Sequence, residues 1–210
     1  LTNLEYADVM RRMADEGARV IYSGDIARAI VDTVRGAKSN PGVITLTDLD
    51  IYEVRERPAI CVPFRGHQVC GMGPPSSGAL TVGQILGLLD QFPVGPRGNP
   101  HTMRLVGDAS RLAFADRGRY MADSDFVPIP TKGLVSDDYL SERAKLLTGA
   151  TALTEVVPGK PEYSHASLWA DDVSLELPST SHISIVDSYG NALSMTTTIE
   201  NGFGSRLMTN

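Results

Sequence analysis

Apolar residues recur at helical spacing over much of the first 120 residues of the chain. This pattern predicts helices over residues 4–16, 25–34, 79–92 and 102–121, and glycines separate several of them. Ser77 precedes the third helix and is expected to cap it, because a serine side chain can accept a hydrogen bond from the first turn. The inward side of that helix is expected to carry Leu80, Ile85, Leu88 and Leu89, and a short capped helix is expected at Thr47-Asp48-Leu49-Asp50.

Alternating segments predict two β-hairpins instead of further helices. The first has strands over 59–62 and 68–72 with Arg65-Gly66 between them. If those two residues form the loop, Cys61 faces Cys70 in a non-hydrogen-bonded pair whose α-carbons lie about 4.5 Å apart. That separation is at the short end of disulfide geometry, so a bridge and two neighbouring free thiols both fit. A bridge is expected only if the protein is secreted.

The second hairpin is predicted from the strand over 180–187, a turn with Tyr189-Gly190, and the strand over 192–198. Centring the turn on Tyr189 places Thr180 opposite Thr198. Centring it between Tyr189 and Gly190 makes Thr198 a diagonal neighbour of Thr180. In both registers two hydroxyl groups lie close together, as a candidate nucleophile and a candidate helper.

A threonine hydroxyl is a weak nucleophile at neutral pH unless a base accepts its proton, and the free amine of an N-terminal threonine is one such base. Thr180 is internal, so it gains that amine only if the Ser179–Thr180 peptide bond is cut. Threonine also has good strand propensity, and Thr-rich hairpins need no catalytic explanation. His182 points to the same face of the strand as Thr180 and either orders the site or is an ordinary hydrogen-bonded strand histidine. Spacing alone leaves the structural and the catalytic interpretations open.

The segment over 179–187, together with Gly190-Asn191 and 196–205, resembles the start of the small subunit of gamma-glutamyltranspeptidases. These enzymes are N-terminal nucleophile hydrolases that are made as one precursor and cut themselves. The resemblance implies an α+β fold, namely a fragment of an αββα sandwich with a helical large-subunit portion and the first hairpin of the small subunit. The upstream likeness runs in order through residues 17–18, 22–27, 46–49, 52–55, 64–66, 74–78 and 111–117.

The resemblance also implies a domain organisation. Residues 1–178 match the C-terminal part of the large subunit, and residues 179–210 match the processing site and the first small-subunit hairpin. Segment 151–178 mixes prolines and a glycine with acidic residues and is interpreted as a mobile loop before the cut site. Family members extend further at both ends, so we expect a central fragment, incomplete at both ends, that is uncut and inactive alone.

The resemblance assigns roles to four residues. The Thr180 hydroxyl would attack the carbonyl of Ser179 during processing and then serve as the catalytic nucleophile toward gamma-glutamyl amides such as glutathione. Thr198 matches the threonine that orients the nucleophile. Glu200 matches a substrate-binding position that is often Asn and that contacts the glutamyl α-amino group. A carboxylate there would repel the neighbouring substrate α-carboxylate, so a cephalosporin acylase-like activity and a non-catalytic homologue both stay open.

Composition excludes several classes of protein. With 42% hydrophobic and 21% charged residues the chain is in the range of globular proteins, and its formal charge of -6 disfavours binding to nucleic acid. The longest stretch without charged residues, 66–89, is interrupted by prolines and predicts no membrane span. The four histidines lack ligand spacing and the two cysteines form no Cys-x-x-Cys pair, so no metal and no cofactor are expected.

The expected partners are a small gamma-glutamyl substrate, an acceptor amino acid, peptide or water, and the rest of the precursor. The family resemblance favours a periplasmic or secreted protein, with a cytoplasmic location still open.

Overall fold

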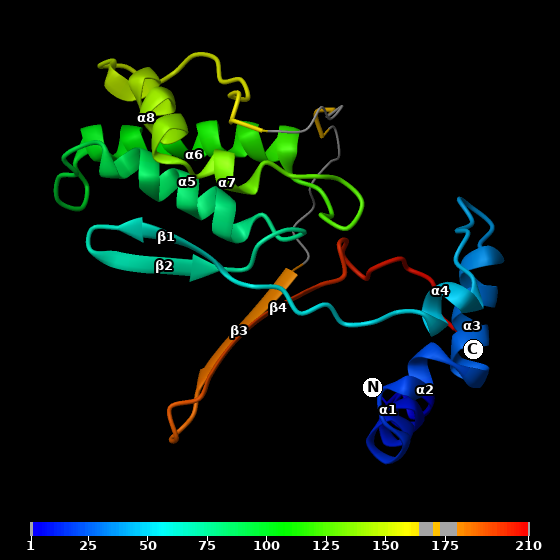
Figure 1. The fold of residues 1–210 in the computed structure, drawn as a ribbon. Helices are drawn as coiled ribbons and strands as arrows, with labels where there is room; N and C mark the ends of the chain where they lie inside the picture. Colours follow the sequence, from blue (N-terminus) through cyan, green and yellow to red (C-terminus); the bar gives the residue numbers. More distant parts are fainter. Residues whose placement is uncertain (1, 164–169, 173–179, 210) are drawn as a thin grey trace. The chain divides into compact units, whose positions relative to one another are not determined.

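The computed structural model describes residues 2–163, 170–172 and 180–209 and contains both helices and strands (Figure 1). The chain divides into two units: Leu1–Arg55 together with Leu175–Asn210, and Glu56–Ser174. The α+β composition expected from the sequence is confirmed.

The N-terminal part of the first unit is helical. Asn3 caps the first helix by accepting a hydrogen bond from the Tyr6 N–H at 2.8 Å, and Gly17, at φ 84°, ends it. The predicted helices over 4–16 and 25–34 are confirmed, whereas the single-turn helix between them was not foreseen. The elements are α1 (Leu4–Glu16), α2 (Arg19–Tyr22), α3 (Gly24–Arg35) and α4 (Leu46–Asp50).

The short helix α4 is present where the sequence predicted it, but its cap is Thr45. The Thr45 side chain accepts from the Asp48 N–H while the Asp48 carboxylate accepts from the Thr45 N–H, which makes a capping box. These bonds lower the pKa of Asp48, chiefly through its hydrogen bond with the Thr45 side chain.

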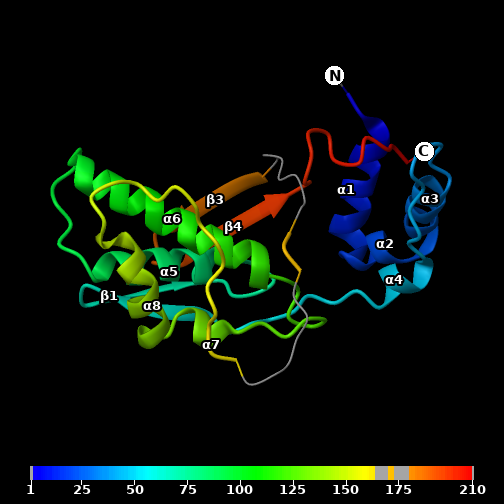
Figure 2. The same cartoon turned by 90° about the horizontal axis from the view of Figure 1, so that it is seen from above.

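The second unit is built around one central helix. Helix α5 contacts the β1–β2 hairpin, α6 and α8, and it lies between the hairpin and the other helices (Figures 1 and 2). The helices enclose a cluster of leucines, alanines and tyrosines that includes Leu88, Leu105, Leu112 and Leu147. The elements are β1 (Ile60–Phe64), β2 (His67–Gly71), α5 (Gly78–Asp90), α6 (Pro100–Tyr120), α7 (Thr131–Leu134), α8 (Asp137–Ala144) and the 3₁₀ helix η1 (Lys145–Thr148).

Two glycines allow α5 to approach its neighbours closely. A Cβ at Gly83 would lie 2.9 Å from Val62 Cγ1 of β1, and a Cβ at Gly87 would lie 2.5 Å from Leu140 Cδ1 of α8. Both distances are shorter than carbon atoms tolerate. The close packing of the β1–β2 hairpin and of α8 against α5 therefore requires glycine, without a side chain, at positions 83 and 87.

Ser77 does not cap α5, which corrects the sequence prediction. Its backbone is already helical, at φ -83° and ψ -9°, and its side chain makes no capping hydrogen bond. A capping residue needs an extended backbone to turn its oxygen toward the first-turn N–H groups. The Ser77 Oγ instead accepts a hydrogen bond from Arg117 Nε of α6 at 3.0 Å.

The β1–β2 hairpin has the predicted register. Arg65 and Gly66 both have positive φ, 47° and 79°, as a two-residue primed turn requires. Cys61 pairs with Cys70 across the strands, with α-carbons 4.0 Å apart, and the two sulfurs are bonded. The prediction that the cysteines are cross-strand neighbours is confirmed. Whether the protein is secreted stays a prediction.

Candidate functional site

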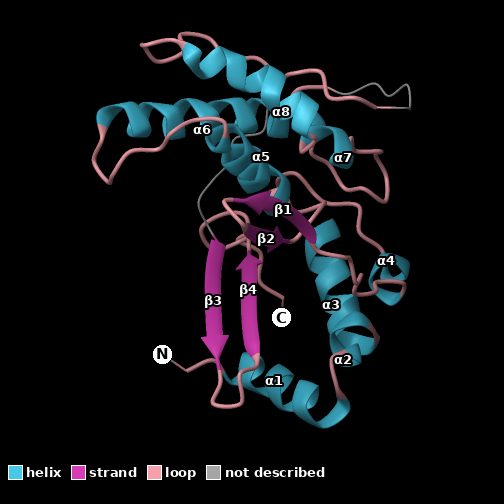
Figure 3. Cartoon of the chain, turned by 60° about the vertical axis from the view of Figure 1, so that its left-hand side comes forward, coloured by secondary structure: helices cyan, strands magenta, loops and turns pink. Residues whose placement is uncertain are grey.

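The two candidate threonines lie on one antiparallel hairpin, formed by β3 (Thr180–Val186) and β4 (Ala192–Thr198) (Figure 3). Thr180 pairs directly with Thr198, which is the first of the two predicted registers. The Thr180 hydroxyl donates a hydrogen bond to Thr198 Oγ1 at 3.0 Å. The hairpin thus brings the candidate nucleophile and its candidate helper into direct contact.

The turn of this hairpin selects that register. Asp187 Oδ1 accepts hydrogen bonds from the N–H groups of Tyr189 and Asn191, each at 2.9 Å, and Asp187 Oδ2 accepts one from Asn191 Nδ2 at 2.7 Å. Gly190 supplies a positive φ of 85°. The Asn191 side chain, followed by the local backbone N–H groups, holds the pKa of Asp187 below its usual value. The ionised Asp187 carboxylate therefore stabilises the turn whose register aligns the two threonines.

The hairpin has one polar and one apolar face. Side chains alternate along a strand, so Thr180, His182 and Ser184 share a face with their partners on β4. His182 Nδ1 lies 2.8 Å from Thr196 Oγ1, and its Nε2 lies 3.0 Å from Ser184 Oγ. His182 is therefore a hydrogen-bonded strand histidine beside the threonine pair. The exposed apolar side chains of the opposite face are Ile183, Ile185, Leu193 and Met195.

Glu200 lies next to the threonine pair through its backbone. The Glu200 N–H donates a hydrogen bond to Thr198 Oγ1 at 3.0 Å, so this oxygen accepts from both Glu200 and Thr180. Glu200 has φ 63°, a left-handed conformation that is uncommon outside glycine. The sequence analysis assigned Glu200 a role through its side-chain carboxylate only. The hydrogen bond from its backbone N–H to Thr198 was not predicted, because no sequence pattern indicates a left-handed residue directly after this strand.

Ser179, the predicted residue before the cut, lies outside the described residues, as do 164–169 and 173–178 of the predicted loop. The described part of that loop, 151–163 and 170–172, contains no helix or strand, and its mobility stays a prediction. Within the described residues there is no group of three or more His, Cys, Asp or Glu that could hold a metal ion. No helix in the described part of the chain has the length and hydropathy needed to cross a bilayer.

Known proteins with a similar sequence or fold include glutathione hydrolase proenzymes, gamma-glutamyltranspeptidases and acylases. The chain is 32% identical to the glutathione hydrolase proenzyme of Escherichia coli (strain K12) over 212 residues, covering 99% of the chain and 34% of that protein. It matches the gamma-glutamyltranspeptidase structure from Helicobacter pylori with a TM-score of 0.71 and 28% identity, over 80% of this chain and 48% of that one. The cephalosporin acylase structure from Bacillus halodurans matches with a TM-score of 0.66 and 28% identity, over 74% of this chain and 28% of that one.

The sequence profile of the family Gamma-glutamyltranspeptidase matches residues 1–210. The chain belongs to the gamma-glutamyltranspeptidase family. It spans about a third of the length of the curated relatives it matches.

Proposed function

We propose that the protein containing this chain is a self-processing gamma-glutamyl hydrolase or transferase whose nucleophile is Thr180. The observation that carries the proposal is the 3.0 Å hydrogen bond from the Thr180 hydroxyl to Thr198 Oγ1, at directly paired positions of one hairpin. Family membership supports the reaction class. The finer fold, in which this hairpin belongs to an αββα sandwich, is part of the same proposal.

Processing in this proposal is an acyl shift from nitrogen to oxygen. The Thr180 oxygen attacks the carbonyl carbon of Ser179, the carbon–nitrogen bond breaks, and the nitrogen takes up the hydroxyl proton as it becomes the free amine of Thr180. Water then hydrolyses the resulting ester. The products are a chain that ends in the Ser179 carboxylate and a chain that begins with Thr180.

Turnover uses the same hydroxyl with the newly freed amine as its base. The Thr180 oxygen attacks the carbonyl carbon of a gamma-glutamyl amide, the amine accepts the hydroxyl proton, and the leaving amine departs with a proton. The acyl-enzyme ester is then cleaved by water or by the amino group of an acceptor amino acid or peptide. No cofactor and no metal is needed to balance either step.

Thr198 orients the nucleophile in this mechanism. Its oxygen accepts the Thr180 hydroxyl while the Glu200 N–H holds the same oxygen from another direction. The bond from Glu200 fixes the Thr198 oxygen, and the bond to that oxygen in turn restricts the rotation of the Thr180 side chain, which lowers the entropic cost of reaching the attack geometry.

Glu200 determines the substrate in this proposal. A carboxylate at this position attracts the α-ammonium group of a gamma-glutamyl substrate and repels its α-carboxylate, and two charges 4 Å apart interact by about 1 kcal/mol even in bulk water. The alternative activity, removal of an acyl side chain from a cephalosporin, uses the same nucleophile on a different acyl group. The structural similarity to a cephalosporin acylase is the observation that favours this alternative.

The test uses the full-length protein with two variants from the same strand pair. Thr180→Ala should remain one chain by mass spectrometry and should release no aniline from a gamma-glutamyl anilide. Thr197→Ala is the matched control, because Thr197 pairs with Ser181 on the opposite face of the hairpin. It should be cleaved and active like the wild type.

Three other results would redirect the proposal. Cleavage of the wild type with turnover of a cephalosporin but not of the anilide would favour the acylase. An intact wild-type chain with neither activity would indicate a non-catalytic homologue. Normal cleavage of Thr180→Ala would refute the assigned nucleophile.

A further inference from the structure

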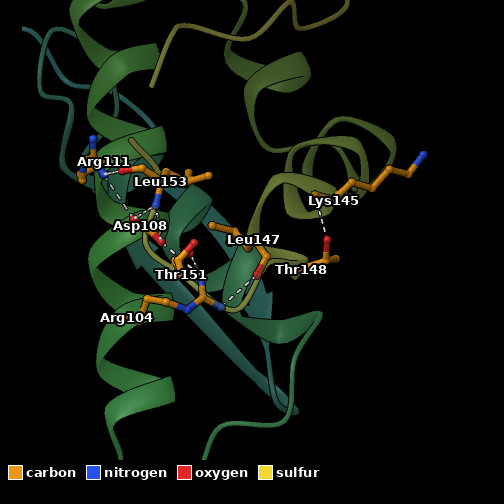
Figure 4. Close-up of polar contacts among 8 residues, drawn as sticks. All are labelled: Arg104, Asp108, Arg111, Lys145, Leu147, Thr148, Thr151 and Leu153. Atoms are coloured by element: carbon orange, nitrogen blue, oxygen red, sulfur yellow. Dashed lines mark hydrogen bonds and ion pairs between the residues drawn. The ribbon is translucent and has the colours of Figure 1, made fainter. Parts of the chain in front are cut away.

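The buried carboxylates of α6, Asp108 and Asp116, have partners within the second unit. Asp108 is 2% exposed, forms ion pairs with Arg104 and Arg111, and accepts a hydrogen bond from the Leu153 N–H at 3.2 Å (Figure 4). Asp116 is 1% exposed and accepts hydrogen bonds from side chains of α5 and α8. Buried carboxylates with such partners stabilise a fold. A reactive group of this unit is therefore sought at its surface.

The disulfide between Cys61 and Cys70 is a reactive group at the surface. Burial alternates along both strands of the β1–β2 hairpin, and Val62, which is 5% exposed, packs against α5, whereas both cysteines are exposed. Because neighbouring side chains of a strand point to opposite faces, the disulfide lies on the face turned away from α5. A dissolved thiol can therefore approach it without any opening of the fold.

The loop that this disulfide closes is short. Only eight residues, 62–69, lie between the two cysteines. The entropy that a disulfide removes from the unfolded chain grows with loop length, so the stabilisation by this bridge is at the low end of the usual range. Exposed disulfides are also the ones that thiols reduce most readily. Both properties are typical of a regulatory bridge.

The β1–β2 hairpin has other contacts that keep it in place. Arg65-Gly66 forms its turn with positive φ at both residues, and Val62 lies against Gly83 of α5. The Ala79 N–H at the start of α5 donates a hydrogen bond to the Met72 carbonyl, directly after β2, at 3.2 Å. None of these contacts involves a sulfur atom. The two cysteines therefore stay opposite each other when the bridge is open.

We propose that Cys61 and Cys70 form a reversible redox site that exchanges with low-molecular-mass thiols and disulfides while the protein stays folded. The proposal concerns the β1–β2 hairpin alone and does not depend on the chemistry of Thr180. In the oxidised state the bridge joins the two strands covalently. In the reduced state the turn and α5 hold the hairpin, so the stability of the second unit changes with the thiol content of the surroundings.

The exchange proceeds in two balanced steps. A thiolate attacks one cysteine sulfur, the sulfur–sulfur bond breaks, and the other cysteine leaves as a thiolate. A second thiolate then attacks the small-molecule sulfur of the mixed disulfide and releases the first cysteine. The two cysteines take up the two protons that the attacking thiols lost. Two small thiols are thereby oxidised to one disulfide, and the protein disulfide is reduced to two thiols.

The test distinguishes exchange in the folded protein from exchange through unfolding. The full-length protein is incubated with excess dithiothreitol, samples are alkylated, and mass spectrometry of the peptides that contain Cys61 and Cys70 gives the reduction rate. Asp108→Asn does not touch the hairpin but removes the charge that pairs with Arg104 and Arg111, so it should raise the unfolded fraction about a hundredfold or more. We expect its reduction rate to stay within about twofold of the wild-type rate.

A reduction rate that rises with the unfolded fraction would overturn the proposal, because the fold would then protect the bridge. If Asp108→Asn does not fold, the wild type in urea below its unfolding transition gives the same comparison. A rate that stays level with urea supports exchange in the folded protein, and a rate that rises steeply overturns it.

Reversibility is measured by closing the bridge again with oxidised glutathione. The reduced protein should keep its circular dichroism spectrum and regain the bridge. Gly83→Ala places a Cβ 2.9 Å from Val62 Cγ1, so β1 must shift and closure should be severalfold slower. Gly107→Ala is the matched control, since its Cβ would meet nothing within 4 Å, and it should close like the wild type. Loss of the folded spectrum on reduction, or equal closure rates in both variants, would overturn the proposal.

Discussion

The Tyr139 hydroxyl offers a direct measurement of how strongly the buried Asp116 is held. It donates to Asp116 Oδ2 at 2.6 Å, and both side chains are buried. Tyr139→Phe removes this donor and leaves the ring volume unchanged, so no cavity forms. A hydrogen bond to a charged group contributes about 1.5–3 kcal/mol, and we expect the free energy of unfolding to fall by about 2 kcal/mol near pH 8.

The pH dependence of this loss is the sharper part of the prediction. Burial, followed by the hydrogen bond with Asp116, raises the pKa of Tyr139 well above its ordinary value of 10. Above pH 10 the unfolded phenol ionises while the folded one keeps its proton. The stability due to this group is therefore fully present below pH 10 and is lost as the pH rises. The wild type should lose about 1.4 kcal/mol from this group by pH 11, and Tyr139→Phe should not.

The assay is urea unfolding followed by circular dichroism at pH 8 and pH 11. Tyr120→Phe is the comparison variant, because the Tyr120 hydroxyl donates to the neutral Gly159 carbonyl and its loss should cost about 1 kcal/mol. The stability gap between the wild type and Tyr139→Phe should shrink from about 2 to below 1 kcal/mol over this pH range. A gap that stays constant would refute the assigned role of the buried phenol.

Three further predictions concern the hairpins. Because the pKa of Asp187 is lowered chiefly by Asn191, the β3–β4 turn should be most stable above about pH 4. The amide protection factors of the turn, taken relative to intrinsic exchange at the same pH, should therefore fall on acidification more in the wild type than in Asp187→Asn. Replacing Cys61 and Cys70 by serine should lower the free energy of unfolding by about 2–3 kcal/mol in denaturant titrations. Thr198→Ala in the full-length protein should slow cleavage and turnover, because the lost hydrogen bond should raise the activation free energy of both steps by about 1–3 kcal/mol. Unchanged rates would show that this residue is only structural.

Short-range patterns in the sequence predicted the elements well. The helix over 4–16 follows from its apolar periodicity, and the Arg65-Gly66 loop follows from the alternating segments on either side of it. The helices over 131–134 and 137–144 were missed, since the first is a single turn and the second has too few apolar positions for a helical period to stand out. The register of the second hairpin stayed open between two choices because it depends on side-chain bonds within the turn.

The buried carboxylate Asp116 of α6 could have been expected from the sequence. Leu105, Ala109, Leu112, Asp116 and Tyr120 form one stripe at three- and four-residue spacing, and a carboxylate within an apolar stripe signals a buried acceptor. Its partners could not have been named, because Gly159 lies 43 residues away and belongs to a segment without periodicity. The threonine pair was predicted because both residues belong to one local hairpin.

The two-faced hairpin of β3 and β4 has a thermodynamic consequence for the nucleophile. An isolated two-stranded ribbon is at best marginally stable in water, and an exposed row of large apolar side chains adds a tendency to associate. Ile183, Ile185, Leu193 and Met195 are exposed in this chain, so the 3.0 Å alignment of Thr180 with Thr198 should be more stable wherever the full-length protein covers them. In the proposed enzyme, any change that leaves this face uncovered should lower the population of aligned nucleophile before it unfolds the rest of the protein, so catalytic activity should be the most sensitive reporter of assembly.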